Sequence, residues 1–254
     1  MSEAALRSAL ERIGSHAPVR FDEVTGSTQA TALELAEAGA PEWTLVAAGH
    51  QTQGRGRLDR SWIDEPGALL FSVVLRPSRG PEHAGLLALL AGTAMVEALR
   101  RTSGAEITCK WPNDLLDGQA KVGGILAGSR IGDGALDFVV LGVGVNLGAA
   151  PAVEGAGALD GADAAEVLGA FLKTFASGYR PSAEGFAAGV LEGYRQVCST
   201  LGRMVRATTT DGGLVEGMAA DVDALGGLLV RSADRTETVR FGDVEHLRPG
   251  ALPG

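Results

Sequence analysis

Two lysines on segments with the pattern of buried β-structure constrain this chain most. Lys110 follows a short apolar run at 107–109, and Pro112 ends the strand there because proline supplies no N–H group to a sheet. Lys121 opens a second predicted strand, over 121–131. A buried ammonium group is costly unless it meets an anion. The two lysines therefore indicate either an anionic ligand or close pairing with carboxylates.

The sequence leaves two interpretations of these lysines open. In one, they contact an anionic ligand, and Gly123-Gly124 lets that ligand approach the backbone closely. In the other, Lys110 pairs with Asp114, and Lys121 extends past apolar neighbours to the surface. Short motifs give false matches, so this stretch alone does not decide between the two.

The second chemical signal is the segment 51–62, whose sequence is Gln-Thr-Gln-Gly-Arg-Gly-Arg-Leu-Asp-Arg-Ser-Trp. Gly54 and Gly56 expose backbone N–H groups and permit positive φ, which can form an anion-binding concavity. Arginine supplies forked donors that match carboxylate and phosphate oxygens. Trp62 offers a flat face on which a purine or an arginine can stack. Taken alone, the segment also fits an arginine-rich surface loop.

Composition and charge exclude several classes of function. The 254-residue chain has a formal net charge of −9 and no run of basic residues. This argues against general nucleic-acid binding, which relies on clustered Lys and Arg. The sequence shows no secretory signal, and its most apolar windows, 86–99 and 138–147, are too short to cross a bilayer. We therefore expect a cytoplasmic protein with no membrane partner.

Neither the cysteines nor the histidines form a metal-binding pattern. Cys109 and Cys198 lie far apart and match no metal spacing, so we expect free thiols in a reducing compartment. The four histidines are scattered along the chain, which argues against metal catalysis. We expect no metal site built by protein side chains alone.

Apolar periodicity predicts an α/β domain followed by a small β-domain. Helices are predicted over 2–14, 29–38, 81–101 and 163–179, with another capped by Ser182, and strands over 19–24, 44–49, 68–75, 107–109, 121–131 and 136–147. Residues 148–161, rich in Gly, Ala and Pro, predict an excursion over the surface. After Gly202, four or five short β-runs alternate with turns. The predicted domains are 1–201 and 202–254.

Four motifs that follow one another in order give the chain a family resemblance. They are Gly54-Arg55-Gly56-Arg57 with Arg60 and Trp62, Lys110-Trp111-Pro112-Asn113-Asp114, Lys121-Val122-Gly123-Gly124-Ile125-Leu126 and Gly142-Val143-Gly144-Val145-Asn146-Leu147. The combination resembles the biotin–protein ligases, also called biotin–acetyl-CoA-carboxylase ligases or holocarboxylase synthetases. The resemblance runs from about Ser27 to Leu147, and the β-runs after Leu201 are similar to the C-terminal domain of that family.

The resemblance implies a fold and a reaction. The catalytic domain would have a mixed, mainly antiparallel sheet with packed helices, as in class II aminoacyl-tRNA synthetases, followed by a small SH3-like β-barrel. The carboxylate of biotin would attack the α-phosphate of ATP, giving biotinyl-5′-AMP and pyrophosphate, and a lysine of a biotin carboxyl carrier domain would then displace AMP. Mg²⁺ is expected on the phosphates. Because family members often pair through an exposed edge of the catalytic sheet, a homodimer is a further expectation.

Roles for individual residues follow from the same resemblance. The catalytic set is Lys121, Arg57, Asp114 and Lys110. The biotin-binding set is Ser27, Thr28, Gln51, Gly54, Arg55, Gly56, Arg57, Lys121, Gly123 and Gly124. The nucleotide-binding set is Arg55, Arg57, Arg60, Trp62, Lys110, Asn113, Lys121 and Asn146. Two structural alternatives stay open: Ser27 or Thr28 can cap a helix, and Asn146 can satisfy local backbone groups at a strand end.

Two residues depart from the family pattern. Asp59 stands where the family commonly has glycine, which puts in doubt the backbone path of the loop and the free charge of Arg57 or Arg60. Gln29 stands where asparagine is usual. Neither change removes a residue that the chemistry needs.

Other functions fit part of the same pattern. A lipoate–protein ligase or lipoyl transferase has a related fold and adenylate chemistry, although the loop with Arg55 and Arg57 and the position of Trp62 favour biotin. A transcriptional repressor that senses biotinyl-AMP needs a DNA-binding module, and too few residues precede Val19 to build one. A non-catalytic module that docks partners through its β-domain would bind biotin without releasing pyrophosphate.

Overall fold

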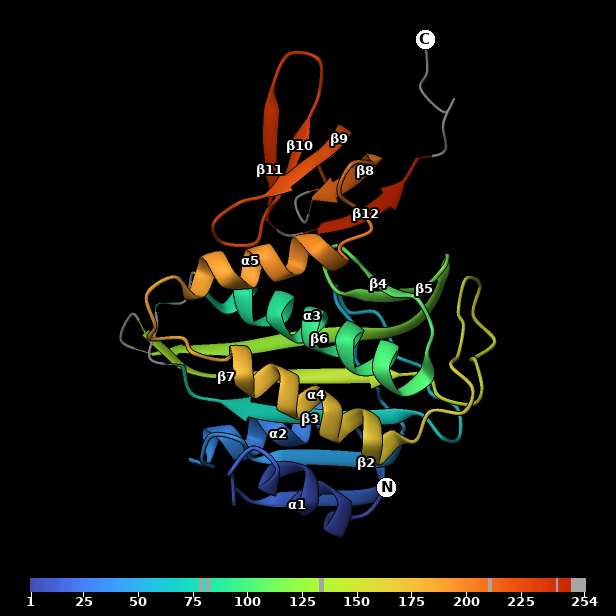
Figure 1. Ribbon diagram of the computed structural model, residues 1–254, viewed down its shortest axis with the longest axis vertical. Helices are drawn as coiled ribbons and strands as arrows, with labels where there is room; N and C mark the ends of the chain where they lie inside the picture. Colours follow the sequence, from blue (N-terminus) through green and yellow to red (C-terminus); the bar gives the residue numbers. More distant parts are fainter. Residues whose placement is uncertain (78–79, 81–82, 133–134, 210–211, 241, 248–254) are drawn as a thin grey trace.

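A seven-stranded mixed sheet forms the centre of the computed structural model, which describes residues 1–77, 80, 83–132, 135–209, 212–240 and 242–247 (Figure 1). The strands are β1 Val19–Thr25, β2 Leu45–Gln51, β3 Leu69–Leu75, β4 Ile107–Lys110, β5 Asp114–Asp117, β6 Ala120–Gly132 and β7 Ala135–Val145. Their order is β1-β2-β3-β7-β6-β5-β4. β1 and β2 are parallel, and every other neighbouring pair is antiparallel. The expected mixed, mainly antiparallel sheet is confirmed.

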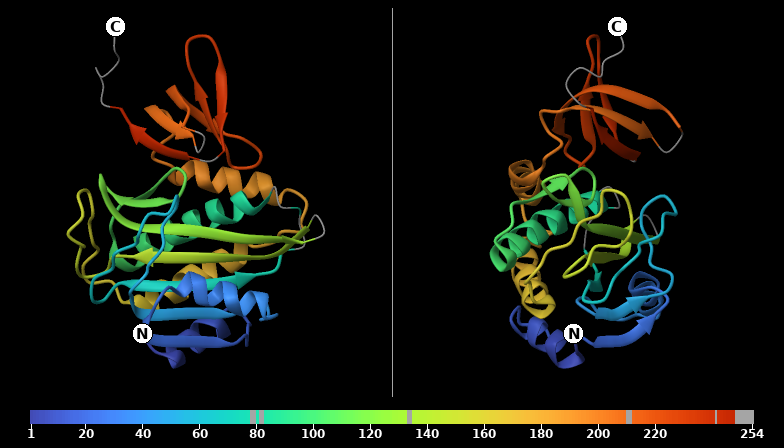
Figure 2. Two further views of the ribbon diagram at one scale, coloured as in Figure 1. Left: turned by 180° about the vertical axis from the view of Figure 1, so that it is seen from behind. Right: turned by 90° about the vertical axis from the view of Figure 1, so that its right-hand side faces the viewer.

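Helices cover the two faces of this sheet unequally. The helices are α1 Glu3–Glu11, α2 Thr28–Glu37, α3 Ala84–Ser103, α4 Ala164–Gly178 and α5 Phe186–Val197. α1, α3 and α4 form one layer, whereas α2 packs alone on the opposite face, against β2, β3 and β7 (Figure 2). A single helix of the described residues therefore packs on the second face of the sheet.

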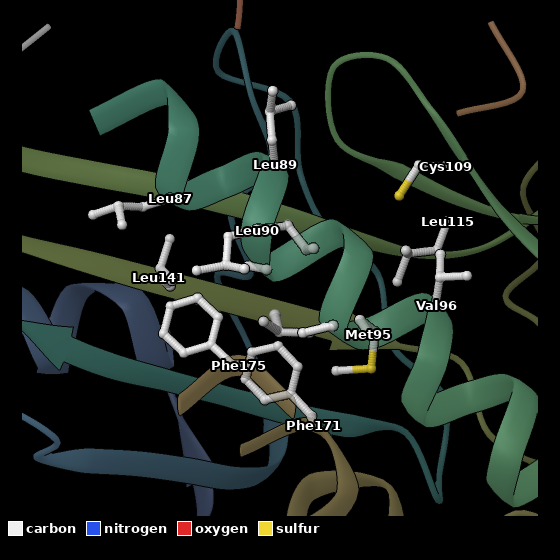
Figure 3. Packing of buried hydrophobic residues seen from close by; sticks show 14 of the residues in the cluster. Leu87, Leu89, Leu90, Met95, Val96, Cys109, Leu115, Leu141, Phe171 and Phe175 are labelled. Carbon is white, nitrogen blue, oxygen red and sulfur yellow. The ribbon is translucent and has the colours of Figure 1, made fainter. Parts of the chain in front are cut away.

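The main core lies between the sheet and the layer that contains α3 and α4. β3 is buried at every position and is apolar except at Ser72, a pattern typical of a strand covered on both faces. From α4, the rings of Phe171 and Phe175 stack with their centroids 5.6 Å apart. Figure 3 shows these rings beside Leu90 of α3 and Leu141 of β7. This packing makes the sheet a rigid support for the side chains on its other face.

The chain ends in a small antiparallel β-domain. Its strands are β8 Met204–Thr209, β9 Leu214–Val222, β10 Leu228–Arg231, β11 Thr236–Val239 and β12 Gly242–His246, in the order β11-β10-β9-β8-β12. Five strands agree with the four or five expected. None of the helices in the described residues is long and apolar enough to span a membrane.

Trp111, in the segment between β4 and β5, is connected to this β-domain by one direct hydrogen bond and by two more that run through Thr200. The indole Nε1 of Trp111 donates to the carbonyl of Gly226 over 3.0 Å, and the Trp111 backbone N–H donates to Thr200 Oγ1 over 2.9 Å. Thr200 Oγ1 lies 3.0 Å from Nε2 of His246 at the end of β12. Because Thr200 accepts from Trp111, its own hydrogen is available to a neutral His246 ring.

Several predicted element boundaries were wrong. β5 was expected to be part of a connection, and four residues are too few to carry a periodic signal. α5 begins at Phe186, since Gly185 before it has a left-handed φ of 79°, and the predicted cap at Ser182 lies outside the helix. α1 is shorter than expected. The predicted helix start at 81–82 and the turn residues 133–134 and 211 lie outside the described residues.

His246 should make the stability of the fold sensitive to mild acid. Burial, reinforced by the positive charges of Lys110 and Arg203, lowers the pKa of His246 from 6.5 to about 4. At pH values between these two pKa values, His246 binds a proton in the unfolded chain but not in the folded chain. The free energy of unfolding should therefore fall as the pH drops through this window.

The variant His246→Gln tests this expectation, because it removes the titrating ring. Its urea-unfolding midpoint should change less than that of the unchanged protein between neutral pH and about pH 4.5. The measurement at neutral pH, where His246 is uncharged, is the reference for both proteins. Parallel pH profiles of the unfolding midpoint for the variant and the unchanged protein would contradict the lowered pKa of His246.

Candidate functional site

A cavity of about 120 Å³ lies on the face of the sheet that carries α2. Twelve predicted site residues line it: Ser27, Thr28, Gln51, Arg55, Gly56, Arg57, Arg60, Trp62, Asn113, Asp114, Lys121 and Gly124. They come from the start of α2, the end of β2, the following loop, β5 and β6. The structure thus brings together motifs that are far apart in the sequence.

The start of α2 leaves a hydroxyl group available in this cavity. Thr28 donates both its backbone N–H and its hydroxyl to Gln51 Oε1, over 2.8 and 3.1 Å. Ser27 stands at the N-cap position, but its side chain makes no capping hydrogen bond. The Ser27 hydroxyl oxygen is buried and has no hydrogen-bond partner in the described residues. The alternative that Ser27 serves only as a helix cap is therefore not supported by its contacts.

Gln29 forms part of the floor rather than a free polar group. Its Nε2 donates to the carbonyl of Val140 over 3.1 Å. A Cβ at Gly142 would lie 2.3 Å from Gln29 Oε1, so only glycine leaves space for this amide. The sheet therefore has space for Gln29 in place of the asparagine that is usual at this position.

The arginine-containing loop folds as a hairpin from Gly54 to Trp62. Trp62 N–H donates to Gly54 O over 2.9 Å, and Gly56 N–H donates to the carbonyl of Arg60 over 2.7 Å. Leu58 and Asp59 at the tip have left-handed φ values of 52° and 58°, the pattern of a type I′ turn. Aspartate tolerates this conformation better than most residues. Asp59 therefore occupies a backbone conformation that suits the glycine usual in the family.

Trp62 lies flat over glycines of β6 and β7. A Cβ at Gly144 would be 2.6 Å from Trp62 Cε2, and a Cβ at Gly124 would be 3.5 Å from Cζ3. Gly54 faces the other end of the same residue, since a Cβ there would be 2.5 Å from the Trp62 carbonyl oxygen. The indole Nε1 is buried without a hydrogen-bond partner in the described part of the chain.

Lys121 and Asp114 form an ion pair at the edge of the cavity. Lys121 Nζ lies 2.5 Å from Asp114 Oδ1, and the two side chains are 42% and 24% exposed. Lys110 is the backbone partner of Asp114 in the β4–β5 ladder. Asp114 therefore forms its ion pair with Lys121 on β6, and not with Lys110 as in the alternative interpretation of the sequence.

Arg57 is the most enclosed of the loop arginines. Its Nη1 lies 3.5 Å from Asn113 Oδ1, while Asn113 Nδ2 donates to the carbonyl of Ile125 over 2.8 Å. Burial lowers the pKa of Arg57, and the carboxylates of Asp243 and Asp114 oppose that shift. A buried cation with incomplete pairing is suited to an anionic ligand.

Four predicted residues lie outside the lining of this cavity. Gly54 and Gly123 are buried, and Lys110 lines a neighbouring cavity of about 250 Å³ with Arg206 and Glu245 of the β-domain. The two cavities share Arg60, Asn113, Asp114 and Asp243. Lys110 and Lys121 therefore face different spaces, which the sequence did not reveal.

The fourth, Asn146, contacts a segment predicted to be only a surface excursion. Its Nδ2 donates to Gly157 O over 2.9 Å, and its Oδ1 is buried without a partner among the described residues. Gly155 O accepts from Lys121 N–H over 2.7 Å, and Gly157 N–H donates to Lys121 O over 2.9 Å. This segment therefore supports the backbone of Lys121, and its only signal in the sequence was a run of small residues.

Comparisons with known proteins identify the family. Residues 21–146 match the Biotin/lipoate A/B protein ligase family, and residues 200–247 match the biotin protein ligase C-terminal domain. A biotin–[acetyl-CoA-carboxylase] ligase of Mycobacterium tuberculosis is 36% identical over 267 residues, which cover 98% of this chain and 96% of that protein. This chain belongs to the biotin protein ligase family.

Other members of the biotin protein ligase family match in part or in fold. The bifunctional ligase/repressor BirA of Bacillus subtilis is 38% identical over 154 residues, 59% of this chain and 47% of that protein, so the match spans about half of its length. The biotin protein ligase of Aquifex aeolicus in complex with biotin and ATP has a TM-score of 0.71 and 25% identity, covering 91% and 99% of the two chains. The Helicobacter pylori biotin acetyl coenzyme A carboxylase synthetase with bound biotinylated ATP has a TM-score of 0.66 and 26% identity, covering 87% and 99%.

The variant Gly144→Ala should displace Trp62 from the floor of this site. The new methyl group would lie 2.6 Å from the indole, and such overpacking costs about 1–3 kcal/mol. We expect acrylamide to quench Trp62 fluorescence more strongly, measured as the difference from a Trp62→Phe protein. Gly189→Ala in α5 is the matched control, because its Cβ would meet nothing within 4 Å. Unchanged quenching in Gly144→Ala would contradict this packing.

Proposed function

We propose that this chain is an ATP-dependent biotin–protein ligase. It forms biotinyl-5′-AMP and transfers biotin to a lysine of a biotin carboxyl carrier domain of a biotin-dependent carboxylase. The observation that carries the proposal is one cavity lined by the unpartnered Ser27 hydroxyl, the Lys121–Asp114 ion pair and the enclosed Arg57. The names of the relatives, and the biotin and ATP bound by the Aquifex aeolicus protein, support the same activity.

Biotin recognition uses the polar groups at the start of α2. A ureido ring presents one carbonyl acceptor and two N–H donors, so it pairs with hydroxyl and amide side chains. Ser27 supplies the free hydroxyl, and Gln51 and Thr28 supply oxygens that already form a fixed network. Trp62 over the glycine floor provides an apolar wall beside them. This combination of a few directed polar groups with apolar walls is typical of small-ligand sites.

Adenylation brings two anions together, so the site must screen their charge. A carboxylate oxygen of biotin attacks the α-phosphorus of ATP, and the bond to the pyrophosphate leaving group breaks. Lys121 and Arg57 are the cations for the carboxylate and the α-phosphate, where charge develops in the transition state. Asp114 holds Lys121 in position through an ion pair that is partly exposed and can admit a ligand.

Transfer to the acceptor uses the other half of the same ion pair. The acceptor lysine nitrogen attacks the carbonyl carbon of the mixed anhydride, and the bond to the phosphate oxygen breaks to release AMP. The amine must give up a proton, and the Asp114 carboxylate, which lines both cavities, is positioned to accept it.

Mg²⁺ enters this proposal with the nucleotide. The described residues contain no cluster of three or more metal-ligating side chains, and Mg²⁺ is commonly held by substrate phosphates with one or two carboxylates. Asp114 and Asp243 are the carboxylates that line the cavity, and each already contacts a cation. The ion would screen phosphate charge when it is bound.

Lys121→Ala separates catalysis from binding. Loss of an electrostatic stabiliser should lower biotin-dependent pyrophosphate release by about 100-fold or more, while biotin binding measured by calorimetry is largely retained. Lys173→Ala, which removes an exposed lysine on α4, is the matched control. Full pyrophosphate release by Lys121→Ala would contradict this role of Lys121, whereas biotin binding without pyrophosphate release by the unchanged protein would favour a binding module over a ligase.

Ser27→Ala should change stability and binding in opposite directions. Its buried hydroxyl has no partner in the described chain, so removing it should leave the free protein equally stable or slightly more stable. The same change should weaken biotin binding by about 1 kcal/mol, since a directed hydrogen bond is lost. Thermal unfolding with and without biotin measures both effects. A destabilised free protein with normal biotin affinity would contradict the assigned role.

The choice between biotin and lipoate rests on ligand-dependent stability. With ATP and Mg²⁺ present, biotin should raise the melting temperature more than lipoate, because a tight ligand stabilises the folded state by mass action. Transfer of labelled biotin to a purified carrier domain then tests the complete reaction. A larger shift with lipoate, together with lipoate transfer, would favour the lipoate–protein ligase alternative.

A further inference from the structure

The C-terminal β-domain contributes a carboxylate to the cavity described above. Asp243 on β12 lines this cavity and forms an ion pair with Arg60 of the Gly54–Trp62 hairpin. The Arg60 side chain is 69% exposed, whereas Asp243 is only 32% exposed. Figure 2 shows the loop after β2 rising from the sheet toward the β-domain. The pair therefore joins two segments that are distant in the sequence, across the opening of the cavity.

Asp243 is held more firmly than the arginine it contacts. It lies in the antiparallel ladder between β12 and β8, opposite Thr208, and its neighbours Gly242 and Val244 are buried. The β-domain is in turn fixed to the catalytic domain by the Trp111–Gly226 hydrogen bond. A carboxylate on a rigid strand can hold a long, exposed arginine in place, whereas an exposed arginine is not expected to hold the strand.

A second arginine of the same hairpin, Arg57, lines the same cavity as Asp243. The carboxylate favours the charged form of the enclosed Arg57, against the cost of its burial. One carboxylate thus acts on two of the three arginines of the hairpin. By contrast, the Arg235–Glu237 ion pair within the β-domain lines neither of the two cavities.

We propose that Asp243 is a positioning residue that holds the arginine hairpin over the ligase site, so that the β-domain completes the site. This inference rests on the proposed biotin–protein ligase function. With the hairpin held, the arginines face the nucleotide phosphates, and water has less access to the mixed anhydride. Asp243 does not contact the reacting atoms, and it acts through Arg60 and Arg57.

The first test measures the hairpin itself, without any catalytic readout. Trypsin cleaves after arginine, so the free protein should be cut within the hairpin about two- to fivefold faster in Asp243→Asn, which is the range expected for losing an ion pair of this exposure. Asp221→Asn is the matched control, since it removes another ion pair between the domains, with Arg195, away from the hairpin. Equal cleavage in Asp243→Asn and the unchanged protein would overturn the proposal.

The second test measures the reaction. Asp243→Asn should raise the KM for ATP and the rate of biotinyl-5′-AMP hydrolysis by about two- to fivefold, with a smaller change in kcat. Asp243→Glu should restore both the KM for ATP and the rate of biotinyl-5′-AMP hydrolysis. In a protein that already carries Arg60→Gln, Asp243→Asn should have little further effect, because Arg60 and Asp243 act as a unit. Additive effects of the two substitutions, or an equal change in Asp221→Asn, would overturn the proposal. If the unchanged protein formed no biotinyl-5′-AMP, the proposed function would fail instead, whatever the proteolysis result.

Discussion

The close approach of the Gly54–Trp62 hairpin to a strip of glycines is the constraint on which the site depends. On one face of the sheet, α3 and α4 pack apolar side chains against the strands. On the other face, β6 and β7 have glycine at Gly124, Gly142 and Gly144, where any Cβ would meet Trp62 or Gln29. A cavity can form there because the strands contribute backbone but no side-chain volume. The rigid packed face then keeps this thin floor in place.

Charge in the cavity is balanced locally, which explains how an acidic protein can hold a cationic site. Lys121 contacts Asp114, and Arg60 contacts Asp243. Each pair is partly exposed, so neither carries the full desolvation cost of a buried ion pair. Arg57 is more enclosed and has no ion-pair partner of its own within the described residues. An anionic ligand would therefore gain most from Arg57, while the paired cations provide a prearranged surrounding charge.

The sequence predicted the elements whose signals are local. Patterning and capping act over a few residues, so they predicted the apolar-rich strand β3, the Asp163-capped helix α4 and the alternating strands of the β-domain. The family was also predicted correctly, since its four motifs are contiguous strings. The structure gathers most of the predicted site residues in one cavity, while their individual roles stay predictions.

What escaped sequence reasoning depends on contacts between distant segments. The pairing of Lys121 with residues 155–157 and the approach of Asp243 to Arg60 join parts of the chain that share no local pattern. Lys110 and Lys121 looked equivalent because both stand on strands beside glycine or proline. Their separation into two cavities follows from the pairing register of β4, β5 and β6, which spacing alone does not determine.

The segment between β4 and β5 connects these separate features. Trp111 in this segment is hydrogen-bonded to Gly226 and Thr200, and Asn113 is hydrogen-bonded to the carbonyl of Ile125 on β6. Asp114, which follows at the start of β5, forms the ion pair with Lys121. A shift of the β-domain would thus be transmitted through Trp111 to the neighbouring Asn113 and Asp114, and through Asp243 to the arginine hairpin. Both routes end at residues that line the same cavity. The small β-domain is therefore coupled to the site through the hydrogen bonds of Trp111 and through the partly exposed Arg60–Asp243 ion pair.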